Sequence, residues 1–140
     1  MFYRITFRTY CYATEALEKV EKALRFVTRS NNITKTKLSG YYGNPVIVLE
    51  TELNTANDCN NFFSALEKPV VKKLITELEA RTDEDCNFYI RFDKQKAFEQ
   101  EYQLSEGGDT IATRCKLKVF PPKKEIAILK LKEFLENLYH

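Results

Sequence analysis

Arginine, lysine and tyrosine recur at alternate positions in three short segments of this 140-residue chain. In FYRITFRTYCY, residues 2–12, one set of alternate positions is apolar and the other is polar or aromatic. FYIRFD and TIATRCKLKVF, residues 88–93 and 110–120, repeat the pattern. Period-two alternation is typical of a half-buried β-strand. The outward positions are Arg4, Arg8, Tyr10, Tyr89, Arg91, Arg114, Lys116 and Lys118.

Cations interleaved with aromatic rings suit a single-stranded nucleic acid. Lysine and arginine neutralise phosphates, and tyrosine rings or guanidinium planes stack on unpaired bases. A sheet face exposed only to water also carries polar residues, and lysine and arginine are common there. The alternation therefore indicates an RNA-binding face or a merely solvated one, and does not decide between them.

The stretch GYYGNP, residues 40–45, places two of the four glycines around Tyr41 and Tyr42. Glycine reaches positive φ without steric cost, and Asn44-Pro45 favours a turn. Neighbouring side chains of an extended segment point in opposite directions. We therefore expect one tyrosine to anchor the turn and the other to be accessible to a ligand. The alternative is that both rings pack and the glycines only permit the turn.

Residue types needed for catalysis are scarce. The one histidine is His140, which argues against Ser-His or Cys-His chemistry. Asp83, Glu84 and Asp85 lie together in a polar turn, but they lack the spacing of a calcium loop. The chain contains no P-loop and no GxGxxG. We expect no enzyme activity, no intrinsic ribonuclease activity, no metal and no cofactor.

The four cysteines are far apart in the sequence and form no CxxC pair, so a zinc site is not indicated. Packed thiols are the first interpretation and a disulfide is the alternative. Net charge is only +2 and the hydrophobic content is 44%, as in globular proteins. No apolar run has the length of a membrane span. We expect one domain over residues 1–140, in the cytoplasm and without a membrane partner.

The elements that must position these residues follow from periodicity and turn signals. Thr14 and Thr55 are expected helix caps, and Pro69 suits the first turn of a helix. The glycine pair in SEGGD, residues 105–109, predicts a hairpin between two strands. Expected strands are 2–12, 33–39, 46–53, 88–93, 94–104 and 110–120; expected helices are 14–28, one after Thr55, 69–80 and 123–138.

This order, β-α-β-β-α-α-β-β-β-α, predicts an α+β fold. We expect an antiparallel sheet of about five to six strands with about four helices packed on one face.

Several stretches resemble a known family, the small archaeal RNA-binding-domain proteins also described as predicted exosome subunits. The similar stretches are ATEALEKVEKAL, GYYGNPVIVLE, ELEARTDED and YIRFDKQKAF, of which GYYGNP and RFDKQ are the most specific. The match runs in order from about residue 10 to about residue 120 and leaves the final helix outside. The family's fold is similar to that of the ribosomal protein that binds 5S ribosomal RNA.

The resemblance implies RNA binding, with RNA-processing or exosome proteins as further partners and a homodimer as an open possibility. It brings no catalytic residues. By position, it points to Thr14, Glu15, Gly40, Tyr41, Tyr42, Gly43, Asn44, Pro45, Arg91, Asp93, Lys94 and Gln95. We expect Arg91, Lys94 and Gln95 of RFDKQ, with Tyr41 and Tyr42, to contact the RNA. The alternative is a subunit that joins an RNA-processing assembly without touching RNA.

One departure from the family stands after KQKAF. Family members often continue with a small residue such as glycine, whereas this chain has Glu99-Gln100-Glu101. Two carboxylates beside the expected site predict weaker RNA affinity, because they repel phosphates.

Overall fold

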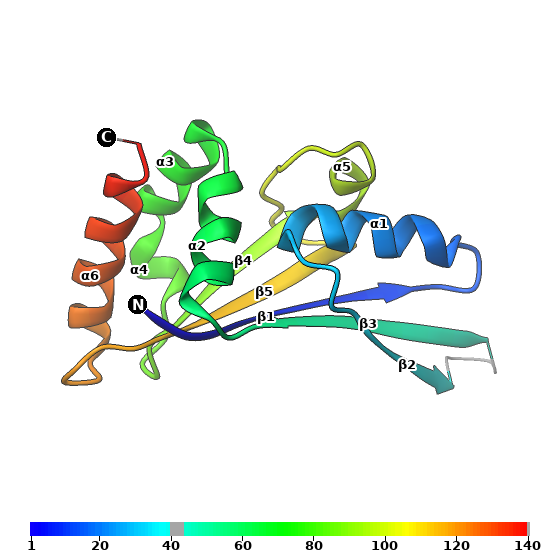
Figure 1. Cartoon of the computed structure of the whole chain (residues 1–140), viewed down its shortest axis with the longest axis horizontal. Helices are drawn as coiled ribbons and strands as arrows, with labels where there is room; N and C mark the ends of the chain where they lie inside the picture. The colour runs from blue at the N-terminus through cyan, green and yellow to red at the C-terminus, as the bar shows by residue number, and fades with distance from the viewer. Residues whose placement is uncertain (40–43, 140) are drawn as a thin grey trace. The chain divides into compact units, whose positions relative to one another are not determined.

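The structure is a computed structural model that describes residues 1–39 and 44–139 (Figure 1). The expected elements recur in order, except that a helix replaces the expected strand 94–104 and two helices replace the expected helix 69–80. The strands are β1 (Phe2–Cys11), β2 (Thr34–Ser39), β3 (Pro45–Leu53), β4 (Asn87–Asp93) and β5 (Thr110–Leu117). The helices are α1 (Leu17–Thr28), α2 (Ala56–Ala65), α3 (Lys68–Thr76), α4 (Leu78–Arg81), α5 (Lys94–Phe98) and α6 (Lys124–Asn137).

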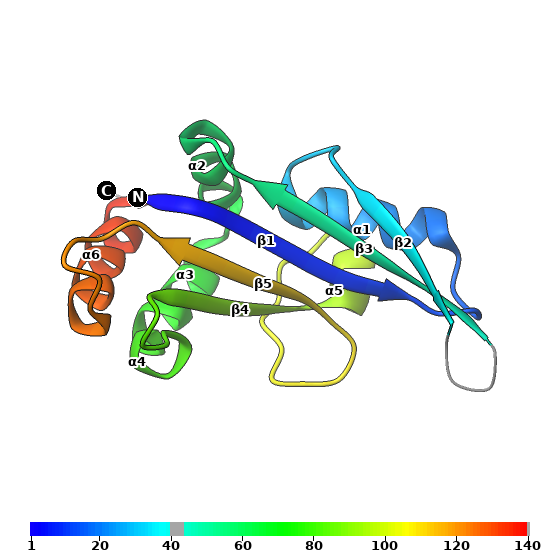
Figure 2. The same ribbon diagram turned by 90° about the horizontal axis from the view of Figure 1, so that it is seen from below.

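The strands form one five-stranded sheet in the order β2-β3-β1-β5-β4 (Figure 2). β2 and β3 pair antiparallel, with a register that runs from Thr34 opposite Glu50 to Ser39 opposite Pro45. An α+β fold built on an antiparallel sheet is thereby confirmed.

Alternation of buried and exposed residues holds along the strands that carry the expected site. Ile5, Phe7, Thr9 and Cys11 are buried in β1, while Arg8 is exposed and Tyr10 half-buried. β4 and β5 show the same alternation, with Phe88, Ile90 and Phe92 buried in one and Ile111, Thr113, Cys115 and Leu117 in the other. Tyr3 stands two residues before Ile5, in the same alternate set, but it is 54% exposed. The regular pattern begins at Ile5.

The chain divides into two compact units, and each contains parts of the long strands. The first unit comprises Met1–Ile5, Leu53–Ile90 and Arg114–His140, and the second comprises Thr6–Glu52 and Arg91–Thr113. In the first unit, Phe2 stacks on Phe63 with ring centroids 5.1 Å apart, and Phe134 meets both rings edge-on. In the second unit, Tyr102 packs against Phe26 and Phe92. Each unit therefore has its own aromatic core.

The expected strand at residues 94–104, and with it the SEGGD hairpin, is wrong. Residues 94–98 form helix α5, and only an isolated bridge between Phe92 and Leu104 follows. The Asp93 carboxylate accepts a hydrogen bond from the Lys96 backbone N–H at 2.9 Å and so caps the helix. Lys94 and Ala97, three residues apart, are the buried positions, as helical geometry requires.

The expected starts of the other helices are partly confirmed. Thr55 caps α2, since its hydroxyl accepts from the Asp58 N–H, and Pro69 stands in the first turn of α3. Thr14 is not a cap: α1 begins at Leu17. The expected helix 69–80 is divided at Glu77 into α3 and α4. The C-terminal helix is confirmed as α6.

Candidate functional site

Two tyrosines meet at the end of β1 in the second unit. The centroids of the Tyr10 and Tyr12 rings lie 6.3 Å apart, and the two ring planes make an angle of 24°. Tyr12 is 45% exposed. Beside Tyr12 is a mostly apolar hollow of about 300 Å³, lined by Tyr12, Ala13, Thr14, Asn44, Pro45 and Val46. An exposed ring at the edge of a small apolar hollow is suited to a planar, unstacked group such as a nucleobase.

A buried lysine lies against the same tyrosine. The Lys94 side chain is 0% exposed, and its Nζ donates to the Tyr10 carbonyl, to Glu15 Oε1 at 2.8 Å and to Asp109 Oδ2 at 3.1 Å. The ammonium also lies 5.3 Å from the centre of the Tyr12 ring. A buried cation is tolerated where it is paired and fully hydrogen-bonded, as it is here.

Glu15 links this ion cluster to the backbone of Tyr12. Its Oε1 accepts from the Tyr12 N–H at 3.0 Å as well as from Lys94. Tyr12 is thus held at its backbone by Glu15 and at its ring by Lys94 and Tyr10. A side chain fixed in this way loses little conformational entropy on binding.

Lys94 is a correction to the expected RNA contacts. Its ammonium is fully buried and used by groups of the protein, so it does not reach a ligand on the surface. The sequence suggested a strand there, whereas the helical backbone of α5 turns Lys94 inward. Gln95, the next residue, is exposed.

Positions singled out by the resemblance gather in this region. Thr14, Asn44 and Pro45 line the hollow, and Glu15 and Lys94 form the ion pair beneath Tyr12. Tyr41 and Tyr42 lie outside the described residues, as do Gly40 and Gly43, so their expected roles remain predictions.

The outward cations of the second unit differ in their surroundings. Arg8 donates from Nε and Nη2 to Glu50 Oε2, with the shorter distance 2.9 Å. The hydrogen bond with Glu50 raises the pKa of Arg8 further. Arg91 is exposed in the middle of β4. Arg91 therefore offers a phosphate the more accessible charge, because Arg8 already has a carboxylate partner.

In the first unit, several side chains expected to contact RNA interact with other groups of the protein instead. The Tyr89 hydroxyl donates to Asp83 Oδ2 at 2.9 Å, and Lys116 Nζ donates to the Asp85 carbonyl. Lys118 Nζ lies 5.6 Å from the centre of the Tyr3 ring. Arg4 and Arg114 are exposed. Exposure of Arg4, Tyr89 and Arg114 agrees with the outward direction predicted for them, whereas Lys116 is half-buried and Lys118 follows the end of β5. The part of these residues in binding stays a prediction.

The acidic turn at residues 83–85 has a structural role. Asp83 accepts from the N–H groups of Asp85 and Asn87, at 3.0 and 2.9 Å, and from Tyr89. Partial burial opposes ionisation, but these hydrogen bonds and one from the Asn87 side chain outweigh it and lower the pKa of Asp83. Across residues 1–39 and 44–139, no group of three or more acidic, cysteine or histidine side chains is arranged to hold a metal.

The two glutamates after α5 have a cation beside them. Lys96 Nζ lies 3.4 Å from Glu99 Oε2 and 4.0 Å from Glu101 Oε2. Between them, Gln100 has φ 61°, a left-handed conformation that favours glycine. The backbone therefore favours glycine at Gln100, the second residue after KQKAF.

Tyr12 is the residue that sequence reasoning missed. The signal was present, because Tyr12 stands two residues after Tyr10 and extends the outward series of β1. What the spacing does not reveal is the hollow, which brings together residues 12–14 and 44–46.

The cysteines are buried and unpaired, as the packed-thiol interpretation predicted. Burial raises the pKa of Cys59 and, more strongly, that of Cys115. Such thiols are poor nucleophiles. Among the helices that the structure describes, none is long and apolar enough to cross a membrane.

Comparison with known proteins gives consistent matches along the chain. A family model described as RNA binding matches residues 4–117. RNA-binding protein PAB1135 of Pyrococcus abyssi is 38% identical over 145 residues, which cover 96% of this chain and 94% of that protein. The solved structure of Mth689, a DUF54 protein from Methanothermobacter thermautotrophicus, superposes with a TM-score of 0.82 at 32% identity, covering 96% of this chain and 98% of that one.

Proposed function

The chain belongs to the family described as RNA binding, and from this premise we propose that it binds single-stranded RNA directly, through Tyr12 and its hollow. A base enters the hollow and stacks on the Tyr12 ring. Exposed cations of the same unit, Arg91 among them, attract the phosphates. The protein acts by binding and carries out no chemistry on the RNA.

The observation that carries this proposal is the fixed, exposed ring of Tyr12. It is 45% exposed although Lys94, Glu15 and Tyr10 all hold it in place. Stacking contacts are sequence-tolerant, since every base has a π-face. The site therefore suits unpaired RNA of varied sequence.

Replacing Tyr12 by alanine tests the proposal. Tyr12→Ala should cost roughly 1–3 kcal/mol of affinity for a fluorescent single-stranded oligonucleotide, the usual scale for one lost stacking contact. Tyr12→Phe keeps the ring and should bind within a few-fold of the original protein. Affinity is measured by fluorescence anisotropy, and thermal unfolding is followed in parallel.

Tyr3→Ala is the matched control, because Tyr3 is an exposed tyrosine of the other unit. Equal losses of affinity in the Tyr12 and Tyr3 alanine variants would show that the hollow has no special role.

Absence of catalysis is part of the proposal and has its own test. Purified protein should leave single-stranded RNA intact in magnesium or manganese. Asp83 is committed to the turn by its hydrogen bonds, which supports this expectation. Metal-dependent cleavage that disappears in Asp83→Ala or Asp85→Ala would contradict it.

A second function is membership of a larger RNA-processing assembly, related to the exosome as the resemblance implies. An apolar groove in the first unit, described below, favours it. Salt separates the two functions: phosphate binding weakens steeply as salt rises, whereas an apolar docking surface is much less affected. Association with exosome proteins at high salt, without RNA, would support the second function.

A further inference from the structure

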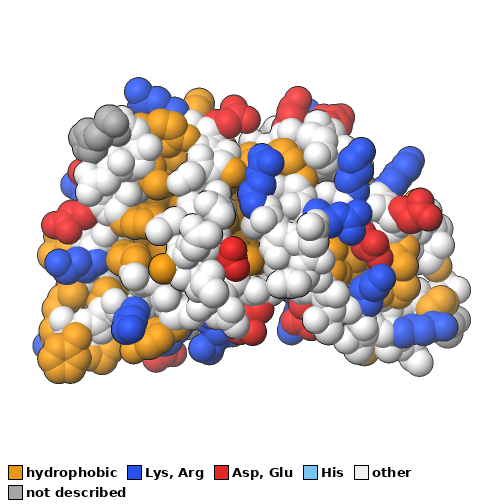
Figure 3. Space-filling model, viewed as in Figure 1, with side chains coloured by type: hydrophobic (Ala, Val, Ile, Leu, Met, Phe, Trp, Pro, Cys, Tyr) orange, Lys and Arg blue, Asp and Glu red, His pale blue; other side chains and the backbone are white. Residues whose placement is uncertain are grey.

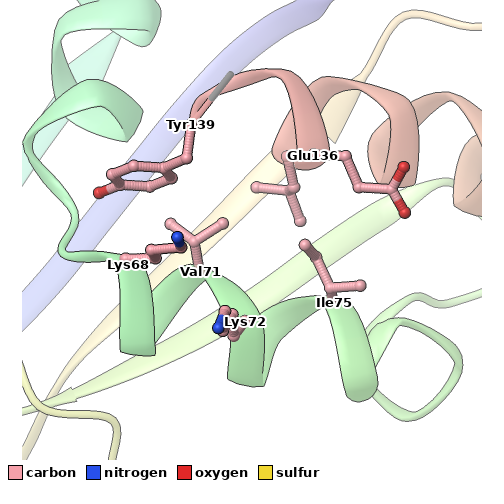
Figure 4. A pocket seen from close by; sticks show the side chains of 7 residues that line it. Lys68, Val71, Lys72, Ile75, Glu136 and Tyr139 are labelled. Atoms are coloured by element: carbon pink, nitrogen blue, oxygen red, sulfur yellow. The ribbon is translucent and has the colours of Figure 1, made fainter.

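Helices α3 and α6 of the first unit pack side by side and leave a groove between them (Figure 4). Its volume is about 280 Å³. The lining residues are Lys68, Val71, Lys72, Ile75, Leu135, Glu136 and Tyr139. Figure 3 shows hydrophobic side chains gathered on the side of the first unit where α3 and α6 lie. The groove is separate from the Tyr12 hollow, which belongs to the other unit.

The floor of the groove is apolar. Val71 and Leu135 are buried and Ile75 is half-buried, and Figure 4 shows Val71 and Ile75 pointing from α3 toward α6. Tyr139 closes one end and remains 42% exposed. Its hydroxyl donates to the Leu66 carbonyl, so the ring is held in position as a wall. Covering the exposed apolar edges of the groove with another apolar surface is favourable, because it removes them from water.

The two rims carry different charges. On α3, Lys68 and Lys72 are exposed and stand four residues apart, one helical turn along the same side. On α6, Glu136 lies 3.9 Å from Lys132, so its charge is balanced locally. The groove therefore has an apolar floor and one cationic rim.

We propose that this groove binds an amphipathic helix of a partner protein, with apolar side chains toward the floor and carboxylates toward Lys68 and Lys72. Val71 and Ile75 are also four residues apart, which matches the spacing of apolar anchors on a docked helix. Carboxylates on the partner are inferred from the cationic rim, since complementary charges select partners and orient them.

Other occupants fit the groove less well. RNA would place phosphates against the lysines but would leave aliphatic side chains on the floor without a partner. A small polar ligand would find few convergent polar groups. A second copy of the chain is the remaining occupant, and the experiment below identifies it if present.

The experiment uses the full-length protein, labelled with ¹⁵N, and two synthetic helical peptides. Each has about four turns, with leucines at i, i+3, i+4 and i+7; one carries flanking glutamates and the other lysines. The acidic peptide should shift the amide resonances of Val71, Ile75 and Leu135, and should bind roughly tenfold or more tightly than the basic peptide.

Variants assign the binding to the groove. Lys68→Glu with Lys72→Glu should lower affinity for the acidic peptide roughly tenfold or more and should favour the basic peptide. Lys19→Glu with Lys22→Glu is the matched control on α1, where both lysines are also exposed, and should leave affinity unchanged. Ile75→Ala, which shortens one floor residue and keeps the charges, should weaken binding several-fold.

Three results would overturn the inference. They are absence of binding by either peptide, equal binding of the two peptides, and shifts that lie outside α3 and α6. A dimer that forms with increasing concentration and protects the groove resonances would identify a second copy as the occupant. No RNA is present in these experiments, so their failure leaves the RNA-binding proposal untouched, and failure of that proposal leaves the groove untouched.

Discussion

At the scale of single residues, Lys94 shows how a charged side chain can serve the site without touching the ligand. Its ammonium donates hydrogen bonds to the Tyr10 carbonyl at the end of β1, to Glu15 in the segment before α1, and to Asp109. The ammonium also lies beneath the Tyr12 ring. The surrounding carboxylates are only partly exposed, at 18% and 35% for Glu15 and Asp109. This cluster holds Tyr12 in position.

Replacing Lys94 by methionine should lower the free energy of unfolding by about 3 kcal/mol, because removal of one partner of a buried ion pair leaves the others unpaired. Urea unfolding measures the loss. Lys96→Met is the control, because Lys96 is partly exposed and pairs with the exposed Glu99 and Glu101. Similar stability of the two variants would show that the buried cluster contributes no more than a surface ion pair.

Gln100 offers the opposite prediction, a gain in stability. At φ 61° a side chain is strained, whereas glycine is not, although glycine costs more backbone entropy. Gln100→Gly should therefore stabilise the protein by about 0.5–1 kcal/mol, even though it removes the weak hydrogen bond from Gln100 Nε2 to the Ala97 carbonyl. Thermal unfolding measures the change in stability. A melting temperature of Gln100→Gly below that of the original protein would contradict the prediction.

At the scale of elements, edge strand β4 begins from a turn built on one carboxylate. The Asp83 carboxylate accepts hydrogen bonds from the N–H groups of Asp85 and Asn87 and from the hydroxyl of Tyr89. The turn and the first residues of β4 therefore depend on its charge. Arg81 also donates to the Tyr89 carbonyl. Together with the hydrogen bonds between residues 103–105 and the other end of β4, these contacts cover the sheet edge, which limits unwanted strand pairing.

This turn should make stability depend on pH in acid. The folded-state pKa of Asp83 lies below its ordinary value of 3.8, so its contribution is present above that pH and is lost as pH falls through the lowered value. The stability advantage of the original protein over Asp83→Asn should therefore be constant near neutrality and shrink below about pH 4. Urea unfolding between pH 7 and pH 2 measures it.

Tyr89→Phe removes one donor to the same carboxylate and should reduce this pH dependence without abolishing it. An advantage that persists unchanged down to pH 2 would show that the charge of Asp83 does not hold the turn.

At the scale of the whole molecule, charge is nearly balanced: 22 basic and 20 acidic side chains give +2. Attraction of RNA must therefore come from local cations rather than from net charge. Arg8 with Glu50, Lys35 with Glu21 and Lys124 with Glu79 are ion-paired, which reduces the number of cations ready for phosphate. The proposed binding is accordingly expected to be moderate.

RNA affinity should fall with salt, and the slope should report the phosphate contacts. The slope of log affinity against log salt should become shallower by about one in Arg91→Gln, as expected when one phosphate contact is removed. Lys22→Gln, on α1, is the control and should keep the slope. Affinity titrations over a series of salt concentrations provide the measurement, and unchanged slopes in both variants would remove Arg91 from the binding surface.

The sequence by itself determined the fold class and, in β1 from Ile5 onward, β4 and β5, which side chains face water. Period-two alternation in residues 5–11, 88–93 and 111–117 is a local property, because successive side chains of a strand point to opposite faces whatever packs on them. Thr55 and Pro69 likewise act within one helical turn. Tyr41 and Tyr42 remain a sequence prediction.

Only the tertiary structure decided that the Lys94 side chain is buried and where the site lies. A lysine after RFD looks like a surface cation, and its burial depends on Glu15 and Asp109, 79 and 15 residues away in the chain. The Tyr12 hollow and the α3–α6 groove also join distant segments. Spacing along the chain does not encode such encounters, because they depend on how elements pack in three dimensions.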